Sequence, residues 1–269
     1  MSELAERIEE ARTSVASTGA KILVFDIERM KGQFSAEFWD LNDFKGRRIA
    51  ADMVTLWPRT ICVAWNWYGD NRIEFASEWG DGTTGMLTRV WSAVDEADIV
   101  VGHNVAGFDL KKLNTEWRDA GFMAPSTYKV VDTLREARRQ FGDESKTLDA
   151  LCTRLGVSGK TDKYDVEMAR RALDGDTTAQ KQLQEYNEGD IFATLNLYDR
   201  LRGWMPSHPH IGPFDGETMK CNQCGGTDLE RIGTYQADMF TYLEYRCQTC
   251  YGIVKGSTGT RIAISKGVR

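Results

Sequence analysis

Two kinds of apolar pattern alternate along this chain of 269 residues. Short β-branched and aromatic runs between turn residues predict strands at 21–26, 60–67, 72–76, 98–101 and 128–131, with a hairpin turn at 68–71. Apolar residues spaced three or four apart predict helices at 1–20, 85–96, 109–120, 147–155, 165–173 and 177–202. Three strands in succession, followed by strand–helix–strand alternation, are typical of an α/β fold in which helices flank a mixed sheet.

A change in composition near residue 206 divides the chain. Pro206, Pro209 and the pair Gly212-Pro213 mark a linker, because proline and glycine interrupt regular structure. The predicted units are an N-terminal helix (1–20), an α/β domain (21–205), a linker (206–216) and a small C-terminal segment (217–269). The last segment is too short to bury a sizeable core, so we expect it to need a further stabilising element.

Four of the six cysteines lie in the C-terminal segment, as two Cys-x-x-Cys pairs with 22 residues between them. The pairs are Cys221 with Cys224 and Cys247 with Cys250. This spacing is typical of a zinc ribbon, so we expect one structural Zn²⁺ bound by four thiolates. Disulfides would need an oxidising compartment, and the N-terminal segment lacks the apolar core of an export signal. Cys62 and Cys152 are expected to be buried small hydrophobes, and His208 and His210 to be linker residues.

A pair of carboxylates follows the first predicted strand. In Asp26-Ile27-Glu28 the two acids project to one side of the chain, about 7 Å apart, because strand side chains alternate between faces. Two carboxylates placed in this way can bind a divalent cation. The pattern Asp-x-Glu alone is weak evidence, since it recurs at Asp165-Val166-Glu167 and Asp228-Leu229-Glu230, away from any predicted buried strand. A strand that ends in solvated carboxylates is the alternative explanation.

Two further segments carry acidic residues in a context that supports the first pair. Asp109 follows a buried strand and a polar turn at the start of a predicted helix, where a carboxylate also stabilises the helix N-terminus. Tyr186 and Asp190 are four residues apart on a long helix, which places phenol and carboxylate on one face. Tyr128 and Asp132 share this spacing but lie on a predicted strand, where four residues span roughly 13 Å. Carboxylates gathered from distant parts of a chain indicate metal-assisted phosphodiester chemistry.

The order Asp-x-Glu, Asn-x-x-x-Phe-Asp and Tyr-x-x-x-Asp resembles the three motifs of the DEDD superfamily of 3′–5′ exonucleases. The tyrosine makes the chain similar to the tyrosine subclass, which includes proofreading domains of family-B DNA polymerases. It also resembles phage-encoded stand-alone exonucleases that end in a zinc ribbon. The resemblance covers roughly residues 20–203 and implies an RNase-H-like fold. The segment from Arg29 to Trp57 is longer than in compact members, so its role does not transfer.

The resemblance implies a two-metal mechanism with Mg²⁺ or Mn²⁺. Asp26, Glu28 and Asp190 would hold the cation that carries the attacking water. Asp26 and Asp109 would hold the second cation, near the leaving 3′ oxygen. Tyr186 would orient the water, since a phenol with an ordinary pKa near 10 is a poor base at neutral pH.

The resemblance also implies that the substrate is the 3′ end of single-stranded DNA. Asn104 and Phe108 match the second motif and would shape the pocket for the terminal nucleotide, although Phe108 fits a core position equally well. Lys111 in the following helix, and the basic cluster around Arg47 in the long segment after the first motif, are candidates for gripping phosphates. The net charge of −6 does not favour nucleic acid, but bound cations would offset the acidic site.

Two alternatives to a DNA exonuclease stay open. Tyrosine-subclass relatives also trim RNA, and a decayed nuclease fold could serve as a non-catalytic binding or recruitment module. The complete set of four carboxylates, together with Tyr186, argues against decay. Replication or recombination proteins are the expected partners. No run of 18 apolar residues predicts a membrane span, and we expect a cytoplasmic protein, in a bacterial host if the chain is phage-encoded.

Overall fold

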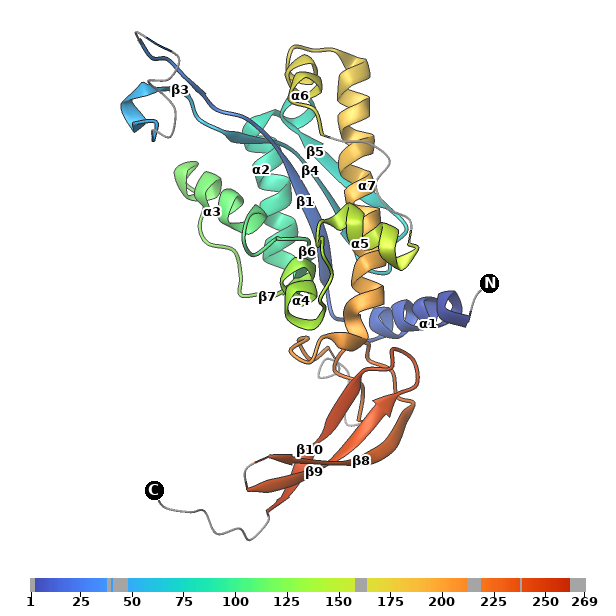
Figure 1. The fold of residues 1–269 in the computed structure, drawn as a ribbon. Helices are drawn as coiled ribbons and strands as arrows, with labels where there is room; N and C mark the ends of the chain where they lie inside the picture. Colours follow the sequence, from blue (N-terminus) through green and yellow to red (C-terminus); the bar gives the residue numbers. More distant parts are fainter. Residues whose placement is uncertain are drawn as a thin grey trace, which may run out of the picture.

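The computed structural model describes residues 3–37, 40, 48–157, 164–211, 219–237 and 239–261. An α/β domain carries a three-stranded sheet at one end and a projecting pair of short strands at the other (Figure 1). Arg47, expected to grip phosphates, lies outside the described residues.

Five strands form the central sheet in the order β5-β4-β1-β6-β7. They are β1 (Ile22–Met30), β4 (Arg59–Trp67), β5 (Ile73–Ser77), β6 (Ile99–Gly102) and β7 (Lys129–Asp132). The neighbours β1, β4 and β5 pair antiparallel as a meander, whereas β6 pairs parallel with both β1 and β7. The predicted mixed sheet is confirmed, and β1 lies at its centre.

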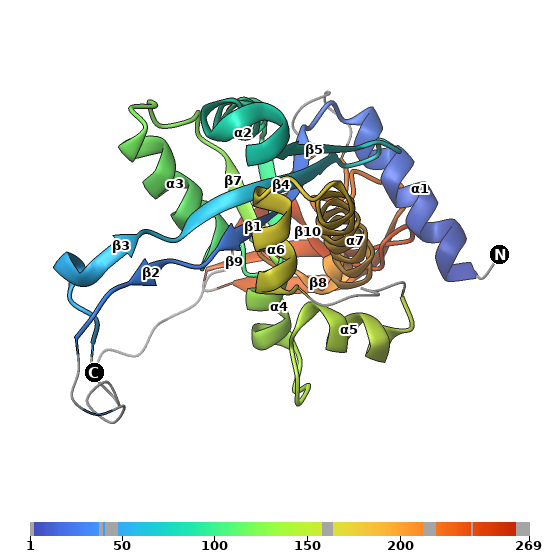
Figure 2. The same cartoon turned by 90° about the horizontal axis from the view of Figure 1, so that it is seen from above.

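Helices cover both faces of this sheet (Figure 2). They are α1 (Glu3–Ser17), α2 (Glu78–Glu96), α3 (Asp109–Asp119), α4 (Thr133–Gln140), α5 (Leu148–Leu155), α6 (Val166–Leu173), α7 (Thr177–Leu201) and the 3₁₀ turn η3 (Arg202–Trp204). α2 and α3 pack on one face, and α7 packs on the other with α5 and α6 beside it. Within the described ranges, no helix combines the length and apolarity that crossing a membrane would require.

The side chains of β1 alternate between these two faces. Phe25 and Ile27 pack with residues of α2 and α3, where full burial of such a side chain contributes roughly 1.5–3 kcal/mol. Val24 packs on the opposite face in the cluster that includes α7. Asp26 and Glu28 follow Val24 at steps of two residues, so the strand period directs both acids toward α7.

The first strand is longer than the sequence predicts. β1 continues past Asp26 to Met30, because Ile27 and Met30 remain in the core. Its register against β4 shifts between Glu28 and Arg29. The two acids therefore lie inside a paired strand, just before an irregularity of the kind that bends a strand and re-aims its side chains.

Two helices also differ from the sequence prediction. α2 begins at Glu78 instead of 85, and Ser77 caps it by accepting a hydrogen bond from the Gly80 N–H at 3.1 Å. Gly82, with φ of 70°, interrupts the helix, which explains why the apolar spacing becomes regular only after it. α4 escapes prediction because its eight residues are mostly polar. Its start is set by Asp132, whose carboxylate accepts hydrogen bonds from two N–H groups of the first turn.

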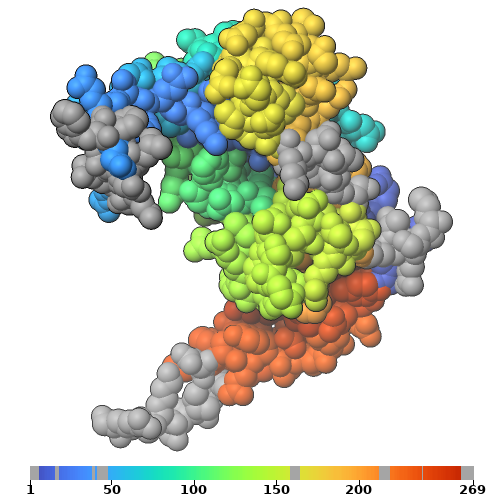
Figure 3. Space-filling view, turned by 45° about the horizontal axis from the view of Figure 1, so that its top comes forward, coloured from blue at the N-terminus to red at the C-terminus, as the bar shows by residue number. Residues whose placement is uncertain are grey.

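A narrow arm extends from β1 beyond the sheet. It consists of β2 (Gln33–Phe34), the 3₁₀ turn η2 (Ala51–Met53) and β3 (Val54–Leu56), and the two strands pair antiparallel. This arm belongs to the long segment after the first motif. Phe34 and Trp57 expose 45% and 62% of their area. Figure 3 shows the molecular surface hollowed between the arm (blue) and the region of α4 and α5 (yellow-green).

The C-terminal segment forms its own antiparallel sheet. Its strands are β8 (Leu229–Ala237), β9 (Phe240–Cys247) and β10 (Ile253–Arg261), in the order β10-β9-β8. Ala11 of α1 joins the buried cluster around the cysteines of this sheet. A Cβ on Gly203 would lie only 2.3 Å from the Cys250 carbonyl oxygen, so η3 packs directly on the segment. The described part of the expected linker is also packed, since His208 and Ile211 are buried.

Candidate active site

Three carboxylates from two distant segments meet between β1 and α7. Asp26 and Glu28 come from β1 and Asp190 comes from α7, and one oxygen atom of each lies within 4.8 Å of the others. Asp190 is buried, and the two acids of β1 are partly buried. Negative charges this close repel each other unless a proton or a cation is shared. The structure thus brings together the first and third predicted acidic segments.

Asn187 fixes the orientation of Asp26. Its Nδ2 donates a hydrogen bond to Asp26 Oδ2 at 2.8 Å, and the Asn187 side chain is fully buried on α7. A hydrogen bond of this kind restricts a metal-binding carboxylate to one rotamer, and removing such partners commonly costs roughly 10–100-fold in metal affinity. The sequence prediction missed Asn187. The available signal was a polar residue between Tyr186 and Asp190 on a buried helix face.

Asp109 lies next to this cluster. As the first residue of α3, it accepts a hydrogen bond through Oδ1 from the Ile27 N–H at 3.2 Å, between the two acids of β1. Within the described residues it is not one of the three whose oxygens lie within 4.8 Å of one another. Burial raises the pKa of Asp109 to about 7, outweighing the backbone hydrogen bonds that lower it. A neighbouring cation would favour the charged form of this carboxylate.

Asp132 organises the loop that precedes Asp109. It is the last residue of β7, and its carboxylate accepts hydrogen bonds from Asn104 N at 3.0 Å and from Ala106 N at 3.1 Å. Asn104 has a left-handed φ of 68°, which asparagine adopts more readily than most residues. Asp132 therefore holds the backbone of the second motif in place. This structural role agrees with the sequence prediction that Tyr128 and Asp132, on one strand, do not act together in catalysis.

His103, one residue earlier, is held by the scaffold. Its Nε2 lies 3.0 Å from Lys146 O, and its Nδ1 lies 2.9 Å from Thr133 Oγ1. A carbonyl oxygen only accepts, so Nε2 donates to Lys146 O, while the Thr133 hydroxyl beside Nδ1 also lies 3.3 Å from Gly102 O. Burial lowers the pKa of His103. This imidazole ties the end of β6 to the segment before α5.

Predicted substrate-contacting residues gather at the start of α3. Phe108 is 40% exposed, and Lys112 Nζ lies 5.8 Å from the centre of its ring. Lys111 is exposed in the first turn of the helix. Of the two interpretations of Phe108, the structure therefore excludes a core position. An exposed ring beside ammonium groups suits contact with a nucleotide.

Tyr186 lies one helical turn before Asp190 on α7. Its ring is 8% exposed and packs edge to face against Tyr164, with ring centroids 6.2 Å apart. Tyr164 donates its hydroxyl hydrogen to Arg29 O at 2.8 Å. Burial, and then the charge of Glu28, raise the pKa of Tyr164 to about 12. Tyr164, which the sequence prediction did not identify, thus fixes the ring of Tyr186 while staying protonated.

The donor set of this site suits hard divalent cations. Mg²⁺ and Mn²⁺ prefer carboxylate oxygen ligands, and the clustered ligands are carboxylates alone. Asp26, Glu28 and Asp190 would hold one cation. Asp109, bonded to the backbone between the first two, is placed to contribute to a second.

Among the described residues, the four cysteines of the C-terminal segment form a second group that could hold a metal ion. The Sγ atoms of Cys221 and Cys250 are 3.6 Å apart. Those of Cys224 and Cys247 are also 3.6 Å apart. Two thiolates on a tetrahedral Zn²⁺ with bonds of about 2.3 Å lie about 3.8 Å from each other, whereas a disulfide requires roughly 2.05 Å. The geometry fits a bound zinc ion and does not fit disulfides.

Comparison with family models identifies the α/β domain. A model described as RNase_H superfamily matches residues 58–202, just over half of the chain. The chain belongs to the RNase_H superfamily. The matched region contains Asp109, Tyr186 and Asp190, whereas the RNase_H model begins after Asp26 and Glu28 on β1. The RNase-H-like fold expected from sequence is confirmed.

Comparison with solved structures adds a distant likeness for this RNase_H superfamily protein. The crystal structure of Trypanosoma brucei RNase D matches at 14% identity, with a TM-score of 0.39. The match covers 72% of this chain and 61% of that one, so the chain spans less than two thirds of the matched structure. No curated protein matches the sequence.

Proposed function

We propose that this RNase_H superfamily protein is a metal-dependent 3′–5′ exonuclease of the tyrosine subclass, acting on the 3′ ends of single-stranded DNA. The observation that carries the proposal is the meeting of Asp26, Glu28 and Asp190 within 4.8 Å. Membership of the RNase_H superfamily supports nuclease chemistry. The order of the three sequence motifs supports the exonuclease class.

Different carboxylates have different roles in the proposed reaction. When bound, two divalent cations lower the pKa of the attacking water and stabilise charge on the leaving 3′ oxygen. Asp26, Glu28 and Asp190 would hold the first cation. Asp109, together with Asp26, would contribute to holding the second. Asn187 keeps Asp26 in the required orientation through its 2.8 Å hydrogen bond.

Tyr186 is assigned to positioning the attacking water. A phenol is protonated at neutral pH, so it can exchange hydrogen bonds with a water molecule but is a poor base. Its ring is buried in the cluster that contains Met30 and Ile61 and packs against Tyr164, which restricts where the hydroxyl can lie. Accurate placement of a reacting water is worth a large rate factor, because misplacement by about 1 Å costs on the order of 10²-fold.

The substrate assignment rests on the shape and chemistry around α3. The surface is hollowed between the arm and α4–α5, as Figure 3 shows. Phe108 offers an exposed ring and Lys111 an ammonium group at the start of α3. A single strand can stack a base on the ring and place a phosphate near the lysine. The likeness to polymerase proofreading domains favours DNA, with replication or recombination proteins as partners.

The experiment uses one sequence prepared as DNA and as RNA, labelled at either the 5′ or the 3′ end. Purified protein is incubated with each, with and without Mg²⁺ or Mn²⁺. We expect a ladder of 5′-labelled DNA that shortens by single nucleotides, and immediate release of the 3′ label, only with metal. A ladder on RNA alone would assign the activity to RNA trimming. Internal cuts, or no cleavage of either polymer, would contradict an exonuclease.

The C-terminal sheet is proposed to be a zinc ribbon. Support comes from the four sulfur atoms, which lie within 4.8 Å of one another with two pairs at 3.6 Å, as a tetrahedral zinc site requires. The segment buries few large apolar side chains, so the metal would supply much of its folding free energy.

A further inference from the structure

The C-terminal sheet presents three aromatic rings on one of its sides. Residues that pair across neighbouring strands share a side, and Tyr235 pairs with Tyr242 while Ala237 pairs with Phe240. Tyr235 and Phe240 are 46% and 40% exposed, and Tyr242 is partly buried. The ring centroids of Phe240 and Tyr242 are 6.2 Å apart. We call the surface formed by Tyr235, Phe240 and Tyr242 the aromatic face.

The other side of the same sheet forms its core. Tyr245 and Cys247 lie on that side of β9, because strand side chains alternate between faces. Tyr245 packs there with Val254 in the buried cluster around the cysteines. None of the three rings of the aromatic face belongs to a buried cluster within the described residues. The sheet is thus covered on one side, and an open aromatic patch on the other side is typical of an interaction surface.

A glycine of β10 makes room for the central ring. Gly259 pairs with Tyr242 across the strands, and a Cβ at Gly259 would lie only 2.6 Å from Tyr242 Cε1. Non-bonded carbon atoms do not approach so closely, so the ring occupies space that any other residue at 259 would fill. A glycine inside a strand commonly marks such a close approach. The position of Tyr242 is therefore determined by the sheet itself.

A lysine extends over the rings. Lys255 Nζ lies 4.5 Å from the ring centroid of Tyr242 and 5.6 Å from that of Tyr235. Glu244 is opposite Lys255 in the strand register, yet the ammonium group extends over the rings. A cation–π contact holds an ammonium in place but, unlike an ion pair, does not cancel its charge. The aromatic face thus combines open rings with a positive charge.

The side of the sheet that carries the aromatic face is positive in sum. Its charged residues are three cations (Lys255, Arg246 and Arg261) and two acids (Glu230 and Glu244), as the strand register shows. The whole chain, in contrast, has a net charge of −6. Positive charge on one surface of an acidic protein attracts an anionic partner to that surface.

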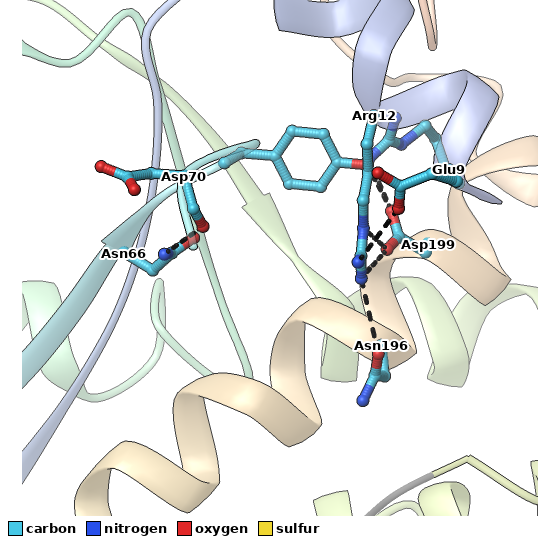
Figure 4. Close-up of polar contacts among 8 residues, drawn as sticks. Glu9, Arg12, Asn66, Asp70, Asn196 and Asp199 are labelled. Atoms are coloured by element: carbon cyan, nitrogen blue, oxygen red, sulfur yellow. Dashed lines mark hydrogen bonds and ion pairs between the residues drawn. The ribbon is translucent and has the colours of Figure 1, made fainter. Parts of the chain in front are cut away.

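The sheet is fixed to the α/β domain through α1. Ala11 of α1 packs in the buried cluster around the cysteines, and the next residue, Arg12, donates from Nε to Asp199 on α7 at 2.9 Å. Figure 4 shows Arg12 pointing from α1 toward Asp199 and Asn196. Because α7 also carries Asp190, the aromatic face keeps a defined position relative to the acidic cluster.

We propose that the aromatic face binds single-stranded DNA. Bases stack on the exposed rings and a phosphate binds the ammonium of Lys255, the two contacts by which proteins hold single strands without reading their sequence. An apolar protein partner would bury this ammonium without an anion, which is costly, whereas a phosphate supplies the anion. Asp190 is eleven residues before Leu201, or about 16 Å of helix, so the face contacts nucleotides away from the 3′ end. The choice of DNA rests on the proposed exonuclease function, but stacking on the face does not.

Binding without cleavage tests this proposal separately from the exonuclease. The full chain carrying Asp190→Asn is titrated with fluorescein-labelled (dT)12 and (U)12 without added divalent metal, so an inactive enzyme gives the same readout. Tyr235→Leu/Tyr242→Leu removes the flat rings and keeps apolar side chains. Phe192→Leu makes the same kind of change at a 50% exposed ring on α7 and is the matched control.

The charge is tested on both sides of the sheet. Lys255→Gln removes a cation from the aromatic face, and Arg231→Gln removes an exposed cation from the other side, where Arg231 pairs with Tyr245. Both variants lose one positive charge, so a general effect of net charge would appear in both. Zinc content and melting temperature show that each variant is folded. If the double leucine variant does not fold, Tyr235→Leu replaces it, because Tyr235 lies on the outer strand β8.

We expect the double leucine variant to bind (dT)12 at least about tenfold more weakly, whereas Phe192→Leu should change the affinity less than about twofold. Lys255→Gln should lower the salt dependence of binding by about one phosphate contact, and Arg231→Gln should not. Equal affinities in the double leucine variant and in Phe192→Leu would overturn the proposal. Equal salt slopes in the two charge variants would also overturn it, as would a loss confined to (U)12.

Discussion

Two acidic side chains of the proposed active site are held by different neighbours. Asp26 accepts a hydrogen bond from Asn187, and Asp109 accepts one from the backbone of Ile27. Both bonds fix a rotamer before any cation arrives. Less reorganisation is then needed on metal binding, which is the usual advantage of a supported ligand shell.

Replacing Asn187 by alanine should weaken metal binding more than it weakens folding. The substitution removes the 2.8 Å hydrogen bond to Asp26 and leaves the carboxylates in place. We expect the Mg²⁺ concentration for half-maximal cleavage to rise roughly 10–100-fold. A Mg²⁺ titration at fixed substrate measures it. Gln182→Ala, at an exposed position of the same helix, is the control. Identical Mg²⁺ titration curves for the two variants would show that Asn187 does not support metal binding.

Replacing Tyr186 by phenylalanine should separate water positioning from metal binding. One hydroxyl is lost and no charge, so Mn²⁺ affinity measured by calorimetry should hardly change. Cleavage should slow by up to the roughly 10²–10⁴-fold range of positioned proton-handling groups. Tyr164→Phe is the matched control, because it removes only the hydrogen bond to Arg29 O, worth about 1 kcal/mol of stability. A fully active Tyr186→Phe enzyme would be incompatible with the assigned role.

At the level of elements, α7 connects the acidic cluster to the junction with the C-terminal sheet. Its middle carries Tyr186, Asn187 and Asp190 against β1, and its end carries Tyr198 and Asp199 against the turn between β4 and β5 and against α1. A helix of 25 residues with both contacts cannot shift at one end without disturbing the other. The geometry of the acidic cluster is therefore tied to the junction with the C-terminal sheet.

Elements with strong local patterns could be predicted from sequence. β1, α3 and α7 follow from apolar periodicity, and the motif acids on them fall on the predicted faces. α4 could not be predicted, because its polar sequence is stabilised as a helix by an Asp132 cap and by packing of Ala137. Periodicity reports burial along one element, so it fails where a helix buries only a narrow strip.

Side-chain contacts between distant elements could not be predicted from the sequence. Asn187 and Asp26 are separated by 161 positions, and Tyr164 reaches Arg29 across 135. Residue type and spacing predicted that the acids would meet, because a shared metal requires it. Asn187 and Tyr164 are not metal ligands, so no motif marks them in the sequence. Their contacts become visible only in the tertiary structure.

Protonation of His208 should weaken the segment that follows η3. Its Nδ1–H donates to Pro209 O at 2.8 Å, so Nε2 accepts from the Tyr198 hydroxyl at 2.7 Å. Burial, and then the charge of Arg202, lower the pKa of His208 to about 3. The unfolded chain binds this proton near pH 6.5, so the stabilisation is complete above 6.5 and is lost as pH falls toward 3.

Chemical denaturation at pH 7 and at pH 4.5 measures this effect. Between these values His208 should account for roughly 2–3 kcal/mol of the lost unfolding free energy. His208→Gln should therefore show a smaller loss between the two pH values than wild type. His210→Gln, at a less buried position, should keep most of the wild-type slope. An unchanged slope in His208→Gln would show that this imidazole is protonated in the folded protein.

At the level of the whole molecule, α1 packs directly against the C-terminal segment. Ala11 of α1 packs into the cysteine cluster, and a Cβ on Gly225 would lie 2.6 Å from Thr18 Cγ2. The C-terminal sheet is therefore part of the folded body and not a tethered appendage. Loss of a zinc ion from this sheet should therefore also destabilise α1 and the end of α7.

We expect one zinc ion per chain, and removal of that zinc should lower the melting temperature of the whole protein. Cys247→Ser should reduce zinc content below one per chain, because a hydroxyl is a poor substitute for a thiolate. Cys152→Ala removes a buried thiol outside the cluster and should keep the zinc. Elemental analysis and thermal unfolding provide both readouts. A folded wild-type protein without zinc would contradict the ribbon.

We propose that carboxylates from β1 and α7 together hold the cation for phosphodiester hydrolysis. Single-turnover cleavage of one 3′-labelled strand by wild type, Asp26→Asn and Asp190→Asn tests it most directly, since each substitution removes one charge at constant size. We predict a loss of about 10³-fold or more in both variants, as expected when several kcal/mol of transition-state stabilisation disappears. Rates within a few-fold of wild type, in folded variants with the same Mg²⁺ dependence, would contradict the claim.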